Sequence, residues 1–200
     1  MIKAIIFDVG GVILDFKPLI LPVVKIFHPE DETKFWEDLN LRFIPLCRGE
    51  GTLLQFWKDL AKEYEKEIPE NTLKKLWRSE FETNLIINKD IIKIIMSLKG
   101  KYKLGIISNT IKEHADIFMK NDYFELFDTV ILSHEVKMTK DAKDIFFLAI
   151  KKLRVKPEEC AFIDDIKKFV ETSKSVGMNA ILFKNPEQLK LELRKLDIKI

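Results

Sequence analysis

The chain has 200 residues, of which 46% are hydrophobic and 33% are charged, and its net charge at pH 7 is +2. This length suits one domain or one domain with an insertion, and the near-neutral charge argues against nucleic acid or an anionic membrane surface as a partner. No run approaches the roughly 18 apolar residues of a membrane span, and two cysteines without special spacing, Cys47 and Cys160, indicate reduced thiols in a cytoplasmic protein.

The first predicted element is a buried β-strand at residues 3–7, which form a short apolar run. The run ends at Asp8, and Val9, Gly10 and Gly11 come next. Asp and Gly are common turn residues, so this segment can be a hairpin turn. A carboxylate beside glycines can also face a ligand, because glycine lets the backbone approach closely. The two interpretations are compatible with each other.

Residues 16–86 interrupt the strand pattern, because they contain no convincing strand. One part of this segment has apolar residues at helical spacing, at Leu53, Phe56, Trp57, Leu60, Ala61 and Tyr64. A second helix can begin after Pro69 and continue through Leu73, Leu76 and Trp77. The segment therefore predicts a small helical bundle, in which we expect packing roles for Trp36, Trp57 and Trp77.

Strands and helices alternate in the rest of the chain. A helix around residues 91–98 ends at Gly100, and strand-like apolar runs cover residues 103–107, 129–132, 161–163 and 180–183. An apolar helix face is formed by Ile145, Phe146, Ala149, Ile150 and Leu153. Such alternation implies right-handed crossovers and a parallel sheet covered on both faces. We predict an α/β protein with a Rossmann-like core of residues 1–15 and 87–200 and an inserted all-helical unit of residues 16–86.

Polar side chains come directly after several of these strands. Ser108-Asn109-Thr110 can cap a helix or hold an anion, and Lys140 can be a solvated lysine or a cation in a site. Asp164 and Asp165 repel each other unless a cation compensates, although Asp165 could also cap the next helix. Because the carboxyl ends of parallel strands open onto one crevice, these groups can meet there with Asp8.

The order of these segments resembles the four motifs of the haloacid dehalogenase-like hydrolase superfamily, and the resemblance covers nearly the whole chain. Residues 6–12, 107–110, 132–140 and 162–165 are similar to motifs one to four, and residues 176–178 are similar to the segment after the fourth motif. The helical insertion resembles the cap of that family. Within the superfamily, the chain is similar to small sugar-phosphate phosphatases such as α-glucose-1-phosphate phosphatases, which often share Gly10 and His114.

The resemblance implies that Asp8 is the nucleophile and forms an aspartyl-phosphate that water then hydrolyses. It implies Mg²⁺ as the cofactor, bound by Asp8, the Gly10 carbonyl and Asp165. Asp164 would bind the ion through water or orient its other ligands.

For the substrate, the resemblance implies a small-molecule phosphate ester, with a sugar phosphate favoured. Ser108, the Asn109 amide and Lys140 would hold the phosphate oxygens, and the cap would close over the crevice and select the leaving group. The sequence does not identify the substrate or the oligomeric state.

Several residues depart from the family pattern. Gly10 stands where an acid usually protonates the leaving oxygen, a step commonly worth about 10²–10⁴ in rate. Lys137, Asp141 and Phe169 also differ from the usual residues, and Asp141 could draw the charge of Lys140 away from phosphate. These departures keep two alternatives open: a catalytically degenerate binding protein of this fold, and a 2-haloacid dehalogenase, which needs no proton donor. His28, His114 and His134 have no metal-ligand spacing.

Overall fold

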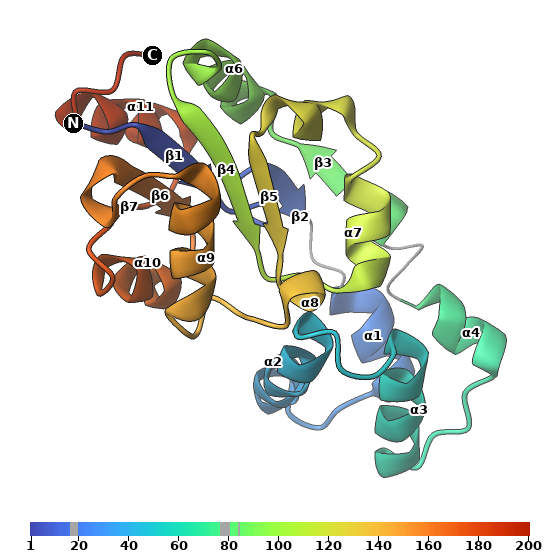
Figure 1. Cartoon of the computed structure of the whole chain (residues 1–200). Coiled ribbons are helices and arrows are strands. Elements are labelled where there is room, and N and C mark those ends of the chain that lie inside the picture. Colours follow the sequence, from blue (N-terminus) through green and yellow to red (C-terminus); the bar gives the residue numbers. More distant parts are fainter. Residues whose placement is uncertain (17–19, 77–80, 84) are drawn as a thin grey trace.

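The computed structural model describes residues 1–16, 20–76, 81–83 and 85–200 (Figure 1). Its centre is a five-stranded parallel sheet with the strand order β5-β4-β1-β6-β7. The strands are β1 (Ala4–Phe7), β4 (Lys103–Ser108), β5 (Thr129–Leu132), β6 (Cys160–Asp164) and β7 (Asn179–Leu182). All five lie where the apolar runs of the sequence predicted them. The α/β fold class and the parallel Rossmann-like sheet are therefore confirmed.

Helices cover both faces of this sheet, as Figure 1 shows. One face packs against α6 (Lys89–Leu98), α7 (Lys112–Phe118), the 3₁₀ turn η1 (Asp122–Leu126) and α11 (Pro186–Lys195). The other packs against α9 (Asp144–Leu153) and α10 (Lys167–Lys174), beside the short elements α8 (Ser133–Val136) and η2 (Pro157–Glu159).

The strand β1 explains why the sheet is buried on both sides. Ile5 and Phe7 point into the first hydrophobic core, and Ala4 and Ile6 point into the second. All four are fully buried, because successive side chains of a strand face opposite sides of the sheet. A strand that is apolar on both faces suits only a central position in a covered parallel sheet.

A small two-stranded antiparallel sheet was not predicted. It is formed by β2 (Leu14–Phe16) and β3 (Leu85–Ile87), so the prediction that residues 16–86 contain no strand is wrong at both ends of that segment. The strands are too short to show an alternating pattern. Their pairing brings the two ends of the inserted segment side by side at the edge of the core.

Between β2 and β3, every regular element of the described residues is helical. The helices are α1 (Ile20–Phe27), α2 (Glu32–Cys47), α3 (Leu53–Glu63) and α4 (Glu70–Lys75), and residues 81–83 are also helical. The helix α3 begins after Thr52, whose hydroxyl accepts a hydrogen bond from the amide of Gln55 at 3.2 Å. The helix α4 starts directly after Pro69, as the sequence indicated.

The insertion has its own hydrophobic core, which is rich in aromatic rings. Trp57 is fully buried, and its ring stacks on Phe27 with the centroids 6.0 Å apart. Trp36 packs edge-on against Phe35 at 5.4 Å, so these two tryptophans have the expected packing roles. Trp77 lies outside the described residues. Ile111, from the segment between β4 and α7, is buried in this same cluster, so the insertion is packed directly against the α/β core.

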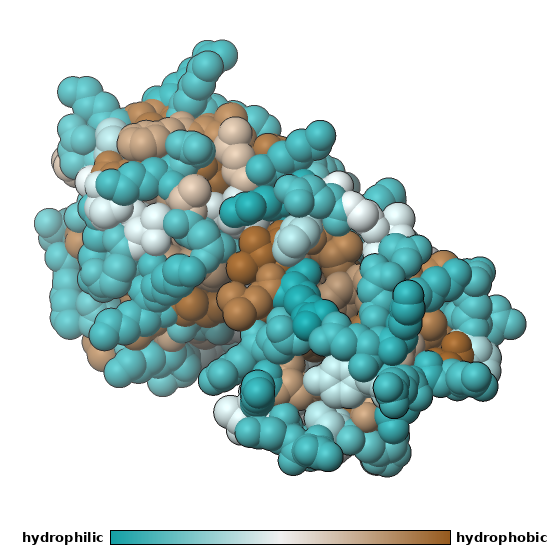
Figure 2. All heavy atoms as spheres, turned by 90° about the horizontal axis from the view of Figure 1, so that it is seen from below, coloured by the Kyte–Doolittle hydropathy of each residue, from teal (hydrophilic) through white to brown (hydrophobic). Residues whose placement is uncertain are grey.

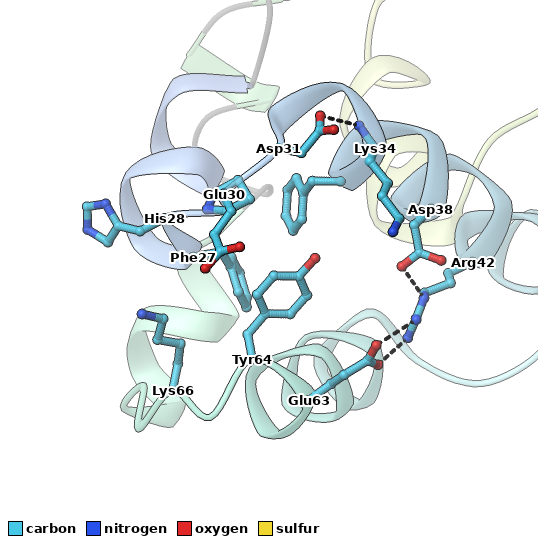
Figure 3. A pocket seen from close by; sticks show the side chains of 12 residues that line it. Phe27, His28, Glu30, Asp31, Lys34, Asp38, Arg42, Glu63, Tyr64 and Lys66 are labelled. Carbon is cyan, nitrogen blue, oxygen red and sulfur yellow. Dashed lines mark hydrogen bonds and ion pairs between the residues drawn. The ribbon is translucent and has the colours of Figure 1, made fainter.

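A cavity of about 620 Å³ lies at the outer side of the insertion, where Arg42 joins two helices (Figure 3). Arg42 binds Glu63 of α3 through two hydrogen bonds of 2.5 and 2.9 Å, and its Nε lies 2.7 Å from Asp38. These side chains are 39–49% exposed, so the pairs contribute little to stability. We assign this cavity no function.

Among the described residues, no helix has both the length and the apolar character that crossing a membrane requires.

Candidate active site

The residues singled out from the sequence meet at the carboxyl end of the central sheet. Asp8 lies just after β1, Ser108 ends β4 and Asp164 ends β6. The strands β4 and β6 flank β1 on opposite sides, and the chain runs from β1 to β4 on one side but from β6 to β7 on the other. Open α/β sheets bind ligands in the crevice at such a switch point. The topology therefore brings together groups that are far apart in the sequence.

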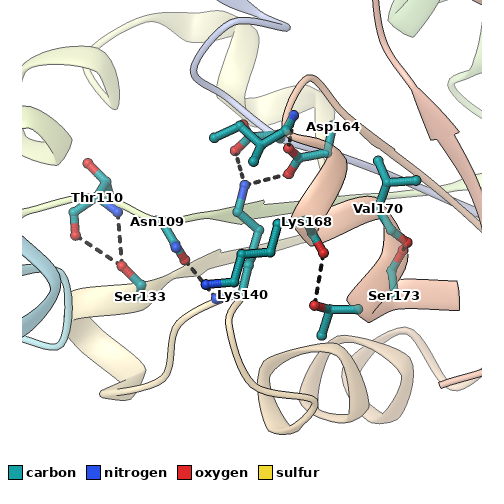
Figure 4. Close-up of polar contacts among 11 residues, drawn as sticks. Asn109, Thr110, Ser133, Lys140, Asp164, Lys168, Val170 and Ser173 are labelled. Atoms are coloured by element: carbon teal, nitrogen blue, oxygen red, sulfur yellow. Dashed lines mark hydrogen bonds and ion pairs between the residues drawn. The ribbon is translucent and has the colours of Figure 1, made fainter. Parts of the chain in front are cut away.

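Lys140 lies at the centre of this group, and it is buried rather than solvated (Figure 4). Its Nζ is 2.7 Å from Asp8 Oδ1 and 2.6 Å from Asp164 Oδ2. The side chains of all three residues are at most 7% exposed. A buried ammonium between two carboxylates is a structured ion triad, which holds Asp8 in one orientation at the end of β1.

Burial is the largest single influence on the pKa values of Asp8 and Lys140 in this triad. It raises the pKa of Asp8 to about 7, because the lowering effect of Lys140 is smaller than the desolvation and the charge of Asp164 adds to the rise. Burial alone would lower the pKa of Lys140, but the charges of Asp8 and Asp164 outweigh it and raise that pKa. Lys140 is therefore a permanent cation, whereas Asp8 needs more positive charge nearby to stay fully ionised.

A third carboxylate, Asp165, completes a group that can hold a metal ion. Asp8, Asp164 and Asp165 each offer a carboxylate oxygen, and these oxygens lie within 4.8 Å of one another. Partial burial, and then the charge of Asp164, raise the pKa of Asp165 as well. Three converging hard oxygen donors with too little compensating charge suit Mg²⁺. The residues present therefore fit the ion that the sequence predicted.

The two oxygens of Asp164 already have protein partners. One binds Lys140, and the other accepts a hydrogen bond from the amide of Ile166 at 2.8 Å. These contacts hold the Asp164 carboxylate in one orientation beside Asp8 and Asp165. Asp165 does not cap a helix: α10 is preceded by Ile166, which makes no side-chain cap.

The segment Ser108-Asn109-Thr110 is bonded to the loop that carries Lys140. Asn109 Oδ1 accepts a hydrogen bond from the Lys140 amide at 2.9 Å, and Ser108 is buried. Ser133 accepts from the Thr110 amide at 2.9 Å and donates to the Thr110 carbonyl at 3.1 Å (Figure 4). None of the three residues caps α7, which is preceded by Ile111 without a side-chain cap. The capping interpretation of this triplet is therefore wrong.

Residues that depart from the family pattern also have clear positions. Asp141 pairs with Lys168, so the expectation that it draws charge from Lys140 is wrong. Phe169 covers Lys140, whose Nζ lies 4.8 Å from the ring centroid, an arrangement favourable for a cation. The sequence marked Phe169 only as unusual, because nothing in it shows which helix residue will face the lysine.

His114 lies one turn into the region after Ser108 and stacks on Phe81, with the ring centroids 3.9 Å apart. Burial lowers the pKa of His114 to about 3. The imidazole is therefore neutral at neutral pH.

The insertion contacts the core at Gly49. This residue has φ +72°, and a β-carbon on it would lie 2.5 Å from the carbonyl oxygen of His134, in the segment that leads to Lys140. Gly49 is exposed on one side and lies close to the core backbone on the other. Glycine permits this close approach.

Gly11 offers a test of the metal site. It has φ +75°, and a β-carbon there would lie 2.5 Å from the carboxyl carbon of Asp165 and nearer still to one of its oxygens. We expect Gly11→Ala to push that carboxylate aside and to weaken Mg²⁺ binding at least about tenfold in calorimetric titration, the size typical of disturbed ligand orientation.

The matched control for Gly11→Ala is Gly100→Ala. Gly100 has φ +79°, and nothing lies within 4 Å of its β-carbon position. Both variants therefore carry the backbone strain of about 1–2 kcal/mol, but only the first moves Asp165. Equal Mg²⁺ affinity in the two variants would show that Asp165 is not a ligand.

Comparisons with known proteins agree with this arrangement. A family model of haloacid dehalogenase-like hydrolases matches residues 2–177. A phosphorylated carbohydrates phosphatase of Thermotoga maritima is 27% identical over 185 residues, which are 90% of this chain and 83% of that protein. A D-ribitol-5-phosphate phosphatase of Bacteroides thetaiotaomicron is 26% identical over 207 residues, covering 96% of this chain and 97% of that protein.

A solved structure has a fold similar to that of this chain. An enzyme of the same family from Bacteroides thetaiotaomicron, determined in complex with magnesium and inorganic phosphate, superposes with a TM-score of 0.75. It is 24% identical, and the match covers 92% of this chain and 95% of that one. At this identity the likeness concerns the fold.

Proposed function

This chain belongs to the haloacid dehalogenase-like hydrolase family, and we propose that it is a Mg²⁺-dependent phosphatase that acts on a small phosphorylated metabolite. The observation that carries the proposal is the buried triad of Asp8, Lys140 and Asp164, with Asp165 beside it at the carboxyl end of the sheet. A carbohydrate phosphate is the favoured substrate, because two relatives that span most of the chain are named as phosphatases of such compounds.

In the proposed reaction, Asp8 attacks the phosphorus atom of the ester. The bond between phosphorus and the ester oxygen breaks as the bond to the carboxylate oxygen forms, and the leaving alkoxide takes a proton from water. Water then attacks the aspartyl-phosphate, which releases inorganic phosphate and restores Asp8. Lys140 holds Asp8 in place during attack and offers positive charge to a phosphate oxygen.

Ser108 and Asn109 complete the proposed phosphate site. Asn109 uses its Oδ1 to bind the Lys140 amide, which leaves its NH₂ group as the donor for phosphate. Ser108 ends β4, two residues beyond Ile106, which pairs with Phe7 at the end of β1. Both groups are uncharged donors that hold phosphate oxygens without adding further charge to the triad.

Asp8, Asp165 and the carbonyl of Gly10 would hold Mg²⁺, with Asp164 fixed by Lys140 and by the Ile166 amide. When bound, the ion would offset the negative charge of the carboxylates and of the phosphate. This charge also favours the ionised form of Asp8, whose pKa is raised in its absence.

We propose that residues 1–15 and 87–200 form the catalytic core and that residues 16–86 form the cap. The hydrophobic cluster of the insertion, to which the α/β core adds Ile111, supports this division. We place the hinge at the antiparallel pair β2–β3, because the chain passes there from one unit to the other. Closure of the cap would exclude water from the crevice.

Removal of the metal tests the proposal. We expect release of phosphate from p-nitrophenyl phosphate to fall at least about 10³-fold in excess EDTA and to return when Mg²⁺ is added. p-Nitrophenolate leaves without protonation, so this substrate also avoids the step for which Gly10 provides no acid. Full activity in EDTA would contradict the proposal.

The two alternatives give different results in the same assay. A 2-haloacid dehalogenase would release chloride from 2-chloropropionate in the presence of EDTA, and the carboxylate cluster gives that anionic substrate no favourable site. A non-catalytic binding protein would bind Mg²⁺ and phosphate without turning over any phosphate ester of a broad panel.

A further inference from the structure

A second cavity, of about 750 Å³, lies between α2 of the insertion and the loops at the carboxyl end of the sheet. Asn109, Thr139 and Asp141 line it on the core side, next to the residues of the proposed phosphate site. A phosphate ester held by Lys140 and Asn109 would therefore extend its alcohol part into this cavity. The role assigned to the cavity thus rests on the proposed function.

The walls of this cavity are mainly apolar. They include Leu39, Leu41, Phe43 and Ile44 from α2 and Ile166 and Phe169 from the core. Leu41 is 66% exposed and Ile166 is 46% exposed, which is unusual for large aliphatic side chains that share one cavity. Figure 2 shows hydrophobic residues gathered at the centre of one face of the molecule, surrounded by hydrophilic ones.

Thr139 adds one polar group to these walls. The residue is 2% exposed, and its hydroxyl has no hydrogen-bond partner among the described residues. A buried hydroxyl without a partner is costly, and such groups commonly acquire a partner from a ligand. Because Thr139 is one of the residues that line the cavity, a ligand there can offer this hydroxyl a partner.

The charges around the cavity argue against an anionic alcohol part. Glu37 lines one wall, and Asp141 is paired with Lys168, so no cation of the lining residues is left without an acidic partner. A second phosphate or a carboxylate on the substrate would meet apolar side chains and Glu37.

We propose that this cavity binds the leaving group and selects phosphate monoesters whose alcohol presents an extended apolar face and a single hydrogen-bonding group, in preference to fully hydroxylated sugars. Leu41 and Ile166 contact the apolar face from opposite sides, and Thr139 binds the polar group. Within carbohydrate phosphates, this chemistry describes deoxygenated sugars. Hydroxyl groups forced against the apolar walls would lose their hydrogen bonds to water without replacement.

Two substrates of equal ring size test the selection. Glucose 6-phosphate and cyclohexylmethyl phosphate are both primary phosphate esters on a six-membered ring, and only the first carries hydroxyl groups. With Mg²⁺ we expect kcat/KM to be at least about tenfold higher for cyclohexylmethyl phosphate, the size of effect that a small apolar contact gives in a binding pocket.

Substitutions of residues that line the cavity test whether the substrate preference arises there. Leu41→Asn should lower the ratio of the two kcat/KM values about tenfold, whereas the matched control Leu191→Asn, at an exposed leucine of α11 outside the cavity, should leave it unchanged. Thr139→Val should raise the ratio about fivefold, because only glucose 6-phosphate loses a hydrogen bond, and Thr139→Ser should restore the wild-type ratio. Thr139→Val should not lower the melting temperature, since it removes a buried hydroxyl that has no protein partner.

The outcomes separate the two proposals. Turnover of p-nitrophenyl phosphate that needs Mg²⁺, together with an equal or reversed preference between the two ring substrates, would overturn the inference about the cavity and leave the proposed function standing. A preference that Leu41→Asn and Leu191→Asn change equally would also overturn it. Failure to hydrolyse any of the three phosphate esters would overturn the proposed function and this inference with it.

Discussion

The variant Asp8→Asn is expected to lose phosphatase activity by a factor on the order of 10³ or more, because a carboxamide cannot accept phosphorus and form an acyl phosphate. The substitution keeps the size of a side chain that is almost completely buried at the end of β1. It can also keep one oxygen within hydrogen-bonding distance of Lys140, which lies 2.7 Å from Oδ1 in the wild type. Initial rates with p-nitrophenyl phosphate at saturating Mg²⁺ measure the loss.

The matched control for this variant is Asp15→Asn. Asp15 lies on β2, close in sequence to Asp8, and its side chain is exposed. Its replacement should change the rate less than about twofold, because surface substitutions away from a site have small effects. Since Asp8 is also a proposed metal ligand, the rates of Asp8→Asn are compared over a range of Mg²⁺ concentrations. Recovery of full activity at high Mg²⁺ would show that Asp8 binds the ion but is not the nucleophile.

Replacing Lys140 by methionine is expected to have the largest effect on stability. Methionine has a similar length, but it leaves the carboxylates of Asp8 and Asp164 buried without their cation. Removal of one partner from a buried ion pair typically costs about 3–5 kcal/mol. We expect a loss of this size in the free energy of unfolding at pH 8, measured by urea denaturation without Mg²⁺, together with loss of phosphatase activity.

The stability loss of Lys140→Met should depend on pH in a defined direction. Burial raises the pKa of Asp8 in the folded protein above the value of 3.8 for an unperturbed aspartate, and loss of the opposing Lys140 charge raises it further. A group whose pKa is raised on folding contributes stability at low pH that disappears as the pH rises through its folded-state pKa. The difference in stability between wild type and variant should therefore be larger at pH 8 than at pH 5.

The control for this second prediction is Lys168→Met. Lys168 also pairs with an aspartate, Asp141, but its side chain is 67% exposed. An exposed ion pair contributes about 0–1 kcal/mol, so this variant should unfold almost like the wild type at both pH values. A pH-independent or negligible loss of stability in Lys140→Met would mean that the triad is not an ionised unit in solution.

The sequence alone was sufficient to predict the five strands of the parallel sheet. Apolar runs bounded by Asp, Gly and Asn predicted five buried strands, because a strand apolar on both faces has no stable place except inside a covered parallel sheet. The order of strands and helices then limited the topology to right-handed crossovers. The same reasoning gave Asp8, Ser108 and Asp164 as neighbours, since each lies where a strand ends at one edge of one sheet.

Short or exposed elements could not be predicted in this way. The three-residue strands β2 and β3 pair across the ends of the insertion, and neither is long enough for a periodic pattern to emerge. The capping preferences of Ser, Asn and Asp were also misleading near the site. Asn109 accepts a hydrogen bond from the amide of Lys140 in another loop, and Ile166 rather than Asp165 directly precedes α10.

The pattern of residue types by itself determined the α/β core and the polar groups at its strand ends. Only the tertiary structure decided that Lys140 is buried between two carboxylates rather than solvated, that Asp141 turns instead to Lys168, and that apolar side chains of α2 face the same cavity as Thr139. Local sequence encodes secondary structure through periodicity, whereas the charge and solvation of a side chain depend on segments that approach it only when the chain has folded.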